Sequence, residues 1–154
     1  MLFHGHCHCG KLKVAFQSEK TPHDIGVRTC QCAFCRSHGA VNVSDPAGFI
    51  TIDAWADDMT RYRFGLMTAD FLICRHCGVY CVAAMSGHDA DKGAQIYATI
   101  NIAGLAMSEF ADLEEAPMDY AAETTDARIE RRYKKWTPTR FTDAALNAAT
   151  FGKT

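Results

Sequence analysis

The sequence predicts a mainly β fold with short helices towards the C-terminus. Runs with period-two alternation or β-branched residues follow one another up to about residue 102. Turn residues separate these runs, and helical patterns occur only in the second half of the chain. All eight cysteines lie between Cys7 and Cys81, so the predicted β region also carries all the thiol chemistry.

The strands are predicted from alternation and from residue type. Leu12, Val14 and Phe16 recur at every second position, as in a half-buried strand. Residues 79–85 and 96–102 form longer runs that are rich in β-branched or aromatic residues. Turn residues at 45–48 and 86–89 separate the runs. Further short strands are expected at 41–43, 49–52, 61–64 and 71–73.

Two helices are expected near the end of the chain. Thr125 and Asp126 are candidate caps for a helix over 127–136, and Thr142 and Asp143 for one over 144–149. The segment 112–123 is acidic and contains a proline, which indicates a loop.

Length and composition favour one globular domain over residues 1–154. Hydrophobic residues make up 48% and charged residues 22%, and the net charge is -2. This balance gives no electrostatic footprint for nucleic acid or an acidic membrane. No apolar run approaches the roughly 20 residues that span a bilayer, and no secretory signal is recognisable. We therefore expect a cytoplasmic protein without a membrane partner; the sequence leaves open whether it forms a homo-oligomer.

The cysteines fall into three clusters and one additional residue. A reducing compartment disfavours structural disulfides, so metal binding is the better interpretation, although an even number of cysteines also permits disulfide pairing. The clusters are Cys7-His8-Cys9, then Cys30-Gln31-Cys32-Ala33-Phe34-Cys35, then Cys74-Arg75-His76-Cys77, with Cys81 beyond.

Two cysteine pairs predict a closed zinc site. Cys74 and Cys77, followed by Gly78, have the form of a zinc knuckle, in which the glycine relieves the backbone at the turn. Cys7 and Cys9 form a tighter pair, and in an extended strand both would lie on one face. Four thiolates leave no open position, which is typical of a structural zinc that stabilises folding by about 10 kcal/mol or more.

The triplet Cys30, Cys32 and Cys35 predicts a second, open zinc site. Three protein ligands with an exchangeable fourth position are the arrangement of catalytic zinc. A thiol that entered this position would lose its proton, and the metal could polarise a carbonyl oxygen. The sequence thus predicts two zinc ions per chain.

Other interpretations of these residues stay open. A fourth ligand from Cys81, His38 or His76 would make the second site structural, and Cys81 is the best candidate, although it could equally be a small buried hydrophobic residue. A redox centre is disfavoured, because no βαβ pattern accompanies the triplet. Three histidines beside the first pair could also compete as ligands or lie on the surface: His4, His6 and His8.

Three blocks, taken jointly, resemble the signature of one family. The family is that of the glutathione-dependent formaldehyde-activating enzymes, which includes the centromere protein V group. The order, spacing and glycines match over roughly residues 5–105, with residues 62–78 closer to the centromere protein V branch. The blocks are residues 5–12 (GHCHCGKL), 30–40 (CQCAFCRSHGA) and 71–79 (FLICRHCGV).

The resemblance implies an antiparallel, zinc-binding β-tent fold and a carbon–sulfur lyase activity. In the family's namesake, glutathione and formaldehyde combine to S-hydroxymethylglutathione, so we expect a small thiol such as glutathione as substrate. Asn101 lies in a degraded form of a further family block and is expected to shape the fold. The resemblance assigns Cys7, Cys9, Cys74 and Cys77 to a structural zinc, and Cys30, Cys32 and Cys35 to a catalytic zinc.

Arginines beside the cysteine blocks are candidates for binding the carboxylates of such a substrate, or are solvated charges: Arg28, Arg36 and Arg75. The alternative function is a non-catalytic, zinc-stabilised module that binds protein or nucleic acid. A basic run supports this alternative, although such a run is more often a solvated helix face and Glu130 interrupts it. The run comprises Arg128, Arg131, Arg132, Lys134 and Lys135.

Overall fold

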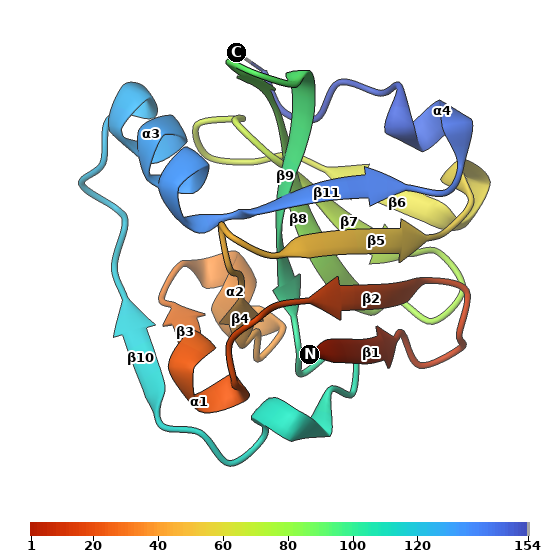
Figure 1. Ribbon diagram of the computed structural model, residues 1–154, viewed down its shortest axis with the longest axis vertical. Helices are drawn as coiled ribbons and strands as arrows, with labels where there is room; N and C mark the ends of the chain where they lie inside the picture. The colour runs from red at the N-terminus through yellow and green to blue at the C-terminus, as the bar shows by residue number, and fades with distance from the viewer. Residues whose placement is uncertain (154) are drawn as a thin grey trace.

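A mixed sheet of eleven strands forms the centre of the structure, a computed structural model that describes residues 1–153 (Figure 1). The strand order is β1-β2-β5-β11-β9-β4-β3-β10, and β8, β7 and β6 continue from β9 as a second branch. The strands are β1 (Leu2–His6), β2 (Lys13–Gln17), β3 (Val27–Cys30), β4 (Asn42–Val43), β5 (Phe49–Asp53), β6 (Met59–Tyr62), β7 (Asp70–Cys74), β8 (Tyr80–Asp89), β9 (Gly93–Asn101), β10 (Glu115–Met118) and β11 (Thr137–Phe141).

The sheet is mixed: most of its strand pairs are antiparallel, as expected, and two are parallel. β11 pairs parallel with β5 and antiparallel with β9, because a strand inserted between two oppositely directed strands must run parallel to one of them. β10 pairs parallel with β3 at the edge of the sheet. The other strand pairs are antiparallel, and the mainly β class is confirmed.

Most predicted strands are present, with two errors at turn residues. The predicted turn at 86–89 belongs to β8, which pairs with β9 as far as Asp89 opposite Gly93. The segment 112–123 is not all loop, since it contains β10, where Pro117 is tolerated at an edge. The strand expected at 61–64 begins two residues earlier, at Met59.

The short helices lie in both halves of the chain, whereas helices were expected only in the second. Threonine side chains cap two of them: Thr21 accepts from the backbone of Asp24, and Thr124 accepts from that of Ala127. The helices are α1 (Pro22–Ile25), α2 (Ala33–Ser37), α3 (Thr125–Lys135) and α4 (Ala144–Asn147), with 3₁₀ turns η1 (Ala56–Asp58) and η2 (Ser108–Phe110). Within residues 1–153, every helix is too short or too polar to cross a membrane.

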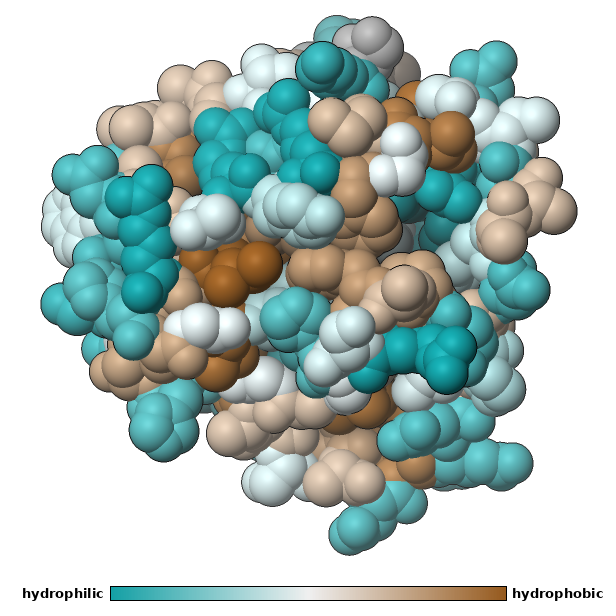
Figure 2. All heavy atoms as spheres, turned by 180° about the vertical axis from the view of Figure 1, so that it is seen from behind, coloured by the Kyte–Doolittle hydropathy of each residue, from teal (hydrophilic) through white to brown (hydrophobic). Residues whose placement is uncertain are grey.

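The buried side chains form two clusters, and each holds one group of cysteines. The larger cluster fills the sheet around Phe16, Ile52 and Leu105 and includes Cys7 and Cys74. The smaller cluster contains Cys35 and packs under α2 and α3. Figure 2 shows that on the face behind that of Figure 1 hydrophobic residues form small patches between hydrophilic ones.

Asn101 crosslinks three segments at the centre of the fold. Its side-chain oxygen accepts from the Val41 backbone N–H at 3.0 Å, and its amide nitrogen donates to the Tyr80 carbonyl at 2.9 Å. Asn101 and Tyr80 are both buried, so the Tyr80 carbonyl would not regain water if the side chain were removed, whereas Val41 is half-buried.

We therefore expect Asn101→Ala to lower the free energy of unfolding by about 2–4 kcal/mol, because the buried Tyr80 carbonyl and the partly buried Val41 N–H lose their partners. Urea denaturation followed by circular dichroism measures this change. Asn42→Ala is the matched control: Asn42 lies opposite Asn101 in the β4–β9 pair, and its side-chain oxygen has no hydrogen-bond partner within residues 1–153. Equal losses in the two variants would contradict the crosslinking role.

Candidate functional site

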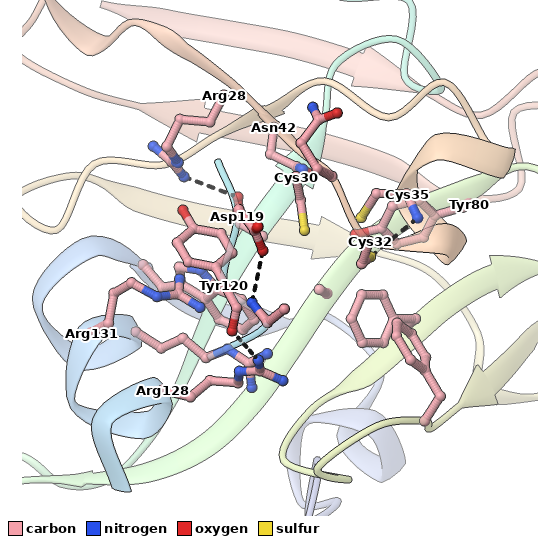
Figure 3. Close-up of a pocket in the computed structure, with 18 residues that line it drawn as sticks. Arg28, Cys30, Cys32, Cys35, Asn42, Tyr80, Asp119, Tyr120, Arg128 and Arg131 are labelled. Atoms are coloured by element: carbon pink, nitrogen blue, oxygen red, sulfur yellow. Dashed lines mark hydrogen bonds between the residues drawn. The ribbon is translucent and has the colours of Figure 1, made fainter. Parts of the chain in front are cut away.

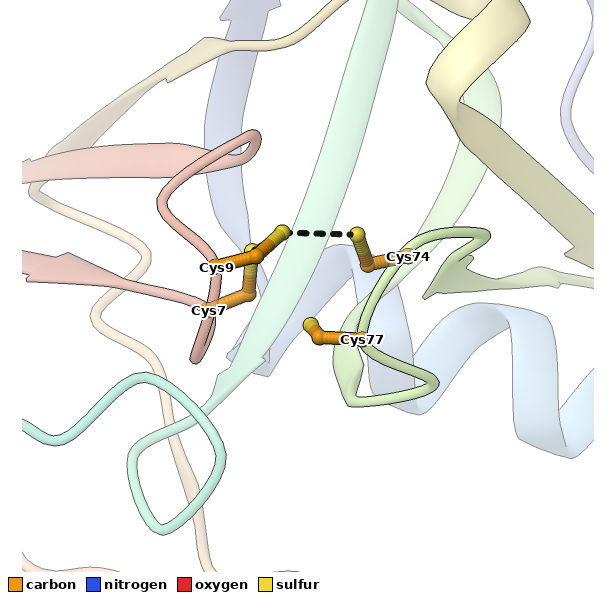
Figure 4. A group of neighbouring side chains, drawn as sticks. All are labelled: Cys7, Cys9, Cys74 and Cys77. Carbon is orange, nitrogen blue, oxygen red and sulfur yellow. Dashed lines mark hydrogen bonds between the residues drawn. The ribbon is translucent and has the colours of Figure 1, made fainter.

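The predicted closed cysteine group is assembled in the structure. The sulfur atoms of Cys7, Cys9, Cys74 and Cys77 all lie within 4.8 Å of one another (Figure 4). Cys9 Sγ is 3.7 Å from Cys7 Sγ and 3.5 Å from Cys74 Sγ. Thiolates at the corners of a tetrahedral zinc site lie about 3.8 Å apart, given zinc–sulfur bonds of about 2.3 Å. The donor set and its spacing therefore fit a metal such as zinc.

Each cysteine pair lies in a turn that ends at a glycine. Cys7 and Cys9 lie in the turn after β1, not on an extended strand as expected, and Gly10 N–H donates to the Cys7 carbonyl at 3.0 Å. Gly78 N–H donates to the Cys74 carbonyl at 2.9 Å. Gly10 and Gly78 have φ angles of 81° and 73°, which favour glycine, as the sequence predicted for Gly78.

Hydrogen bonds favour a thiolate in this group. Burial by itself would raise the pKa of Cys77, but donation from the backbone N–H groups of Cys9 and Val79 lowers it to about 6. Burial raises the pKa of Cys74 to about 12. The group thus holds one thiolate readily, and a bound cation would be needed to stabilise further thiolates.

The triplet is also assembled, through a helix that the sequence did not predict. Cys30 ends β3, Cys32 caps α2, and Cys35 lies in the first turn of α2, with the three sulfurs within 4.8 Å of one another. Cys32 Sγ accepts from the Cys35 backbone N–H at 3.4 Å. Hydrogen bonds from the Cys30 and Cys35 thiols lower the pKa of Cys32 to about 2, while the pKa values of both donors rise. Sulfur donors that share protons in this way also fit a soft or borderline metal.

The candidate fourth ligands lie outside the triplet. Cys81 belongs to the larger buried cluster with Cys7 and Cys74, and its thiol donates to the Val79 carbonyl at 3.4 Å. His76 accompanies the closed group and bonds Asp58 at 2.7 Å. His38 follows α2, and its ring packs 4.5 Å from that of Phe34.

Among residues 1–153, the triplet is therefore a group of three cysteines, without a fourth side chain, that could hold a metal ion. The histidines beside the first pair are exposed and belong to neither group, and His6 bonds the Cys7 carbonyl at 2.7 Å: His4, His6 and His8.

A cavity of about 190 Å³ opens beside the triplet. Figure 3 shows the three sulfurs on one side of it and Arg128 and Arg131 of α3 on the opposite side. Arg28 of β3 lines a further wall, and aromatic rings complete the lining: Phe64, Phe71, Tyr80, Tyr120 and Trp136. The cavity is thus a largely aromatic pocket with thiols at one end and cations along its walls.

The structure divides the candidate arginines. Arg28 lines the cavity and donates to the Ser44 hydroxyl at 2.7 Å, whereas Arg36 and Arg75 are exposed and lie outside the cavity lining.

The residues of the basic run also differ in their positions. Arg128, Arg131 and Arg132 line the cavity, while Lys134 pairs with Glu130 on the helix surface. The basic run was not predicted to line a cavity, although positions 128, 131 and 132 share one helix face.

All four cavity arginines have polar partners, and Arg28 and Arg132 donate to the hydroxyl groups of Ser44 and Thr68. Arg128 and Arg131 both donate to Glu123, at 3.2 and 2.7 Å, and Arg131 lies 3.5 Å over the Tyr120 ring. Hydrogen bonding from Arg131 lowers the pKa of Glu123, so the pair stays charged at neutral pH. Four arginines and Asp119 line the cavity, so its lining favours an anionic ligand.

No protein-family model and no curated protein matches the chain. A crystal structure of a Rhodobacter sphaeroides protein, from a structural genomics project, is similar to it, with a TM-score of 0.51 and 28% sequence identity. The match covers 74% of this chain and 97% of that one. This similarity bears on the fold and carries no statement about function.

Proposed function

We propose that this chain is a zinc-dependent carbon–sulfur lyase that joins a small thiol to an aldehyde and reverses the reaction. Under this proposal it is a relative of the glutathione-dependent formaldehyde-activating enzymes and has their zinc-binding β-tent fold. The observation that carries the proposal is the three-cysteine group at the end of an arginine-lined cavity. Three thiolates are the donor set of a zinc that keeps an exchangeable position.

The two cysteine groups would have different roles. Cys7, Cys9, Cys74 and Cys77 would hold a structural zinc, and Cys30, Cys32 and Cys35 the second one. A zinc ion held by the three thiolates would supply Lewis acidity and lower the pKa of a neighbouring thiol. The closed group offers no such position, so substrate chemistry belongs to the cavity.

The residues of the cavity would bind and orient the reactants. The S–H bond of the substrate breaks, its sulfur forms a bond to the carbonyl carbon, and the π electron pair moves to the oxygen, which takes up the proton that the thiol lost and becomes a hydroxyl group. Burial keeps the pKa of Tyr80 well above its usual value, so its hydroxyl stays protonated and can donate to the carbonyl oxygen. Arginines bind the carboxylates of the thiol.

Two-dimensional NMR exchange on glutathione and formaldehyde tests this function. We expect adduct exchange to exceed the uncatalysed rate in proportion to protein concentration. Repeating it with other small thiols and aldehydes would define the substrate. An exchange rate equal to background, from protein with two zinc ions per chain, would contradict the lyase and favour a non-catalytic zinc-stabilised module.

A further inference from the structure

Two phenylalanine rings form part of the cavity wall. Phe64 and Phe71 both line the cavity, and both residues are partly exposed, so a ligand can reach them. Their ring centres lie 4.6 Å apart at an interplanar angle of 41°. Phe64 lies in the segment after β6, and Phe71 lies on β7. Accessible rings in a cavity are typical of a site that binds an apolar or aromatic group.

Phe34 connects these two rings to the cysteine triplet. It lies between Cys32 and Cys35 at the start of α2, and its ring centre is 5.0 Å from that of Phe64 and 4.9 Å from that of Phe71. The arginines of α3 lie across the cavity from the sulfurs (Figure 3). A carbonyl carbon that reacts at the triplet would therefore have the rings close to its substituent.

The cavity has room for a ring beside Phe71. Ala83 lies opposite Phe71 in the β7–β8 pair and also lines the cavity, and its methyl group leaves space that a larger side chain would fill. The cavity volume of about 190 Å³ exceeds the roughly 150 Å³ of an engineered protein cavity that binds benzene. Formaldehyde, with two heavy atoms, would leave most of this volume to water. Displacing loosely held water from the rings by an apolar group is favourable.

We infer that the carbonyl substrate of this cavity is an aldehyde with an aromatic substituent, which packs against Phe64 and Phe71. The aldehyde part of this inference rests on the proposed function, whereas the aromatic part rests on the two rings and the cavity volume. The thiol R–SH adds across the C=O bond of Ar–CHO to give Ar–CH(OH)–S–R, so the step needs no oxidant or further reactant. Phe64 and Phe71 would then be specificity-determining residues.

Binding of unreactive amides to the zinc-loaded chain tests the aromatic part without relying on catalysis. Acetamide, cyclohexanecarboxamide and benzamide share one carbonyl group and differ in its substituent. We expect benzamide to bind at least about tenfold more tightly than acetamide, because it fills more of an apolar pocket. It should also bind about threefold more tightly than cyclohexanecarboxamide, because a planar ring packs better against other rings. Titrations followed by protein NMR give the dissociation constants, and equal values for benzamide and acetamide would overturn the inference.

Variants assign the contact to the two rings. Phe64→Leu and Phe71→Leu each keep an apolar side chain and remove a ring, so each should weaken benzamide binding about threefold or more and leave acetamide binding unchanged. Phe49→Leu is the matched control, since Phe49 is an exposed phenylalanine on β5 outside the cavity lining, and it should change neither affinity. If both cavity variants fold and bind benzamide as tightly as the unmodified chain, the assignment to these rings is wrong.

Adduct exchange with glutathione separates this inference from the proposed function. We expect the rate enhancement over the uncatalysed reaction to be about tenfold greater for benzaldehyde than for formaldehyde. If benzamide binds as expected but neither aldehyde exchanges faster than background, the lyase function fails and the aromatic site stands. If formaldehyde exchange alone is accelerated and benzamide binds no better than acetamide, the lyase function stands and the aromatic inference is wrong. Should the cavity variants fail to fold, the three amide affinities of the unmodified chain still decide the matter.

Discussion

Cys74→Ser is expected to leave the chain unfolded at room temperature. The closed group joins the turn after β1 to the turn after β7, and its members Cys9 and Cys74 are 65 residues apart in the sequence. A structural zinc contributes about 10–16 kcal/mol to folding, and a domain of this kind has a net stability of about 5–15 kcal/mol. Loss of one of four ligands therefore removes most or all of the net stability. Circular dichroism and zinc analysis of the purified variant measure both effects.

Cys81→Ala is the matched control for this variant. Cys81 is a buried cysteine in the same hydrophobic cluster, but its sulfur is not one of the four that lie within 4.8 Å of one another. Its removal leaves a small cavity and should cost about 1–2 kcal/mol while the zinc content is unchanged. A Cys74→Ser protein with native circular dichroism and full zinc content would show that the closed group does not hold the fold together.

The two cysteine pairs and the triplet could be predicted from the sequence because the members of each are close along the chain. Cys74 and Cys77 are held by one turn, and spacing alone predicts that their sulfurs meet. The fold class followed from alternation in the same way, as the predicted strands in β2, β5 and β7 show. The parallel pairing of β11 was not predictable, because Thr137–Phe141 contains a proline and shows weak alternation, and its position depends on β5 and β9.

The cavity could be predicted only in part, because its walls come from distant segments. Arg28 was a candidate on account of its position beside Cys30, and it lines the cavity. Arg132 lies about 100 positions further along, and as part of a basic run it looked like a solvated charge. Its burial depends on contacts with Thr68 and Trp136, which no local pattern encodes.

Cys32→Ser is expected to remove the second zinc and reduce exchange of the glutathione–formaldehyde adduct to the uncatalysed rate, a loss of more than about a hundredfold. Cys32 has the lowest pKa of the three thiols, about 2, because both of its neighbours donate hydrogen bonds to it. Cys32 would be one of the three thiolates that hold the second ion, so its loss removes a direct ligand. In other metalloproteins, mutating a residue that only hydrogen-bonds a metal ligand already lowers metal affinity or activity about 10–100-fold. Loss of a direct ligand should exceed that range. Zinc analysis and the NMR exchange rate are the measurements.

Cys32→Ser separates the effect of losing a metal ligand from any effect on folding, because serine can replace Cys32 as the N-cap of α2. Its sulfur accepts from the Cys35 backbone N–H, and serine is among the best residues at such a position, so Cys32→Ser keeps the cap and loses the thiolate. Ser37→Ala, on the exposed end of the same helix, should retain both zinc ions and full exchange. If Cys32→Ser retained two zinc ions, the triplet would not hold the second ion. If it held one ion and still catalysed exchange, the chemistry would lie elsewhere than in the arginine-lined cavity.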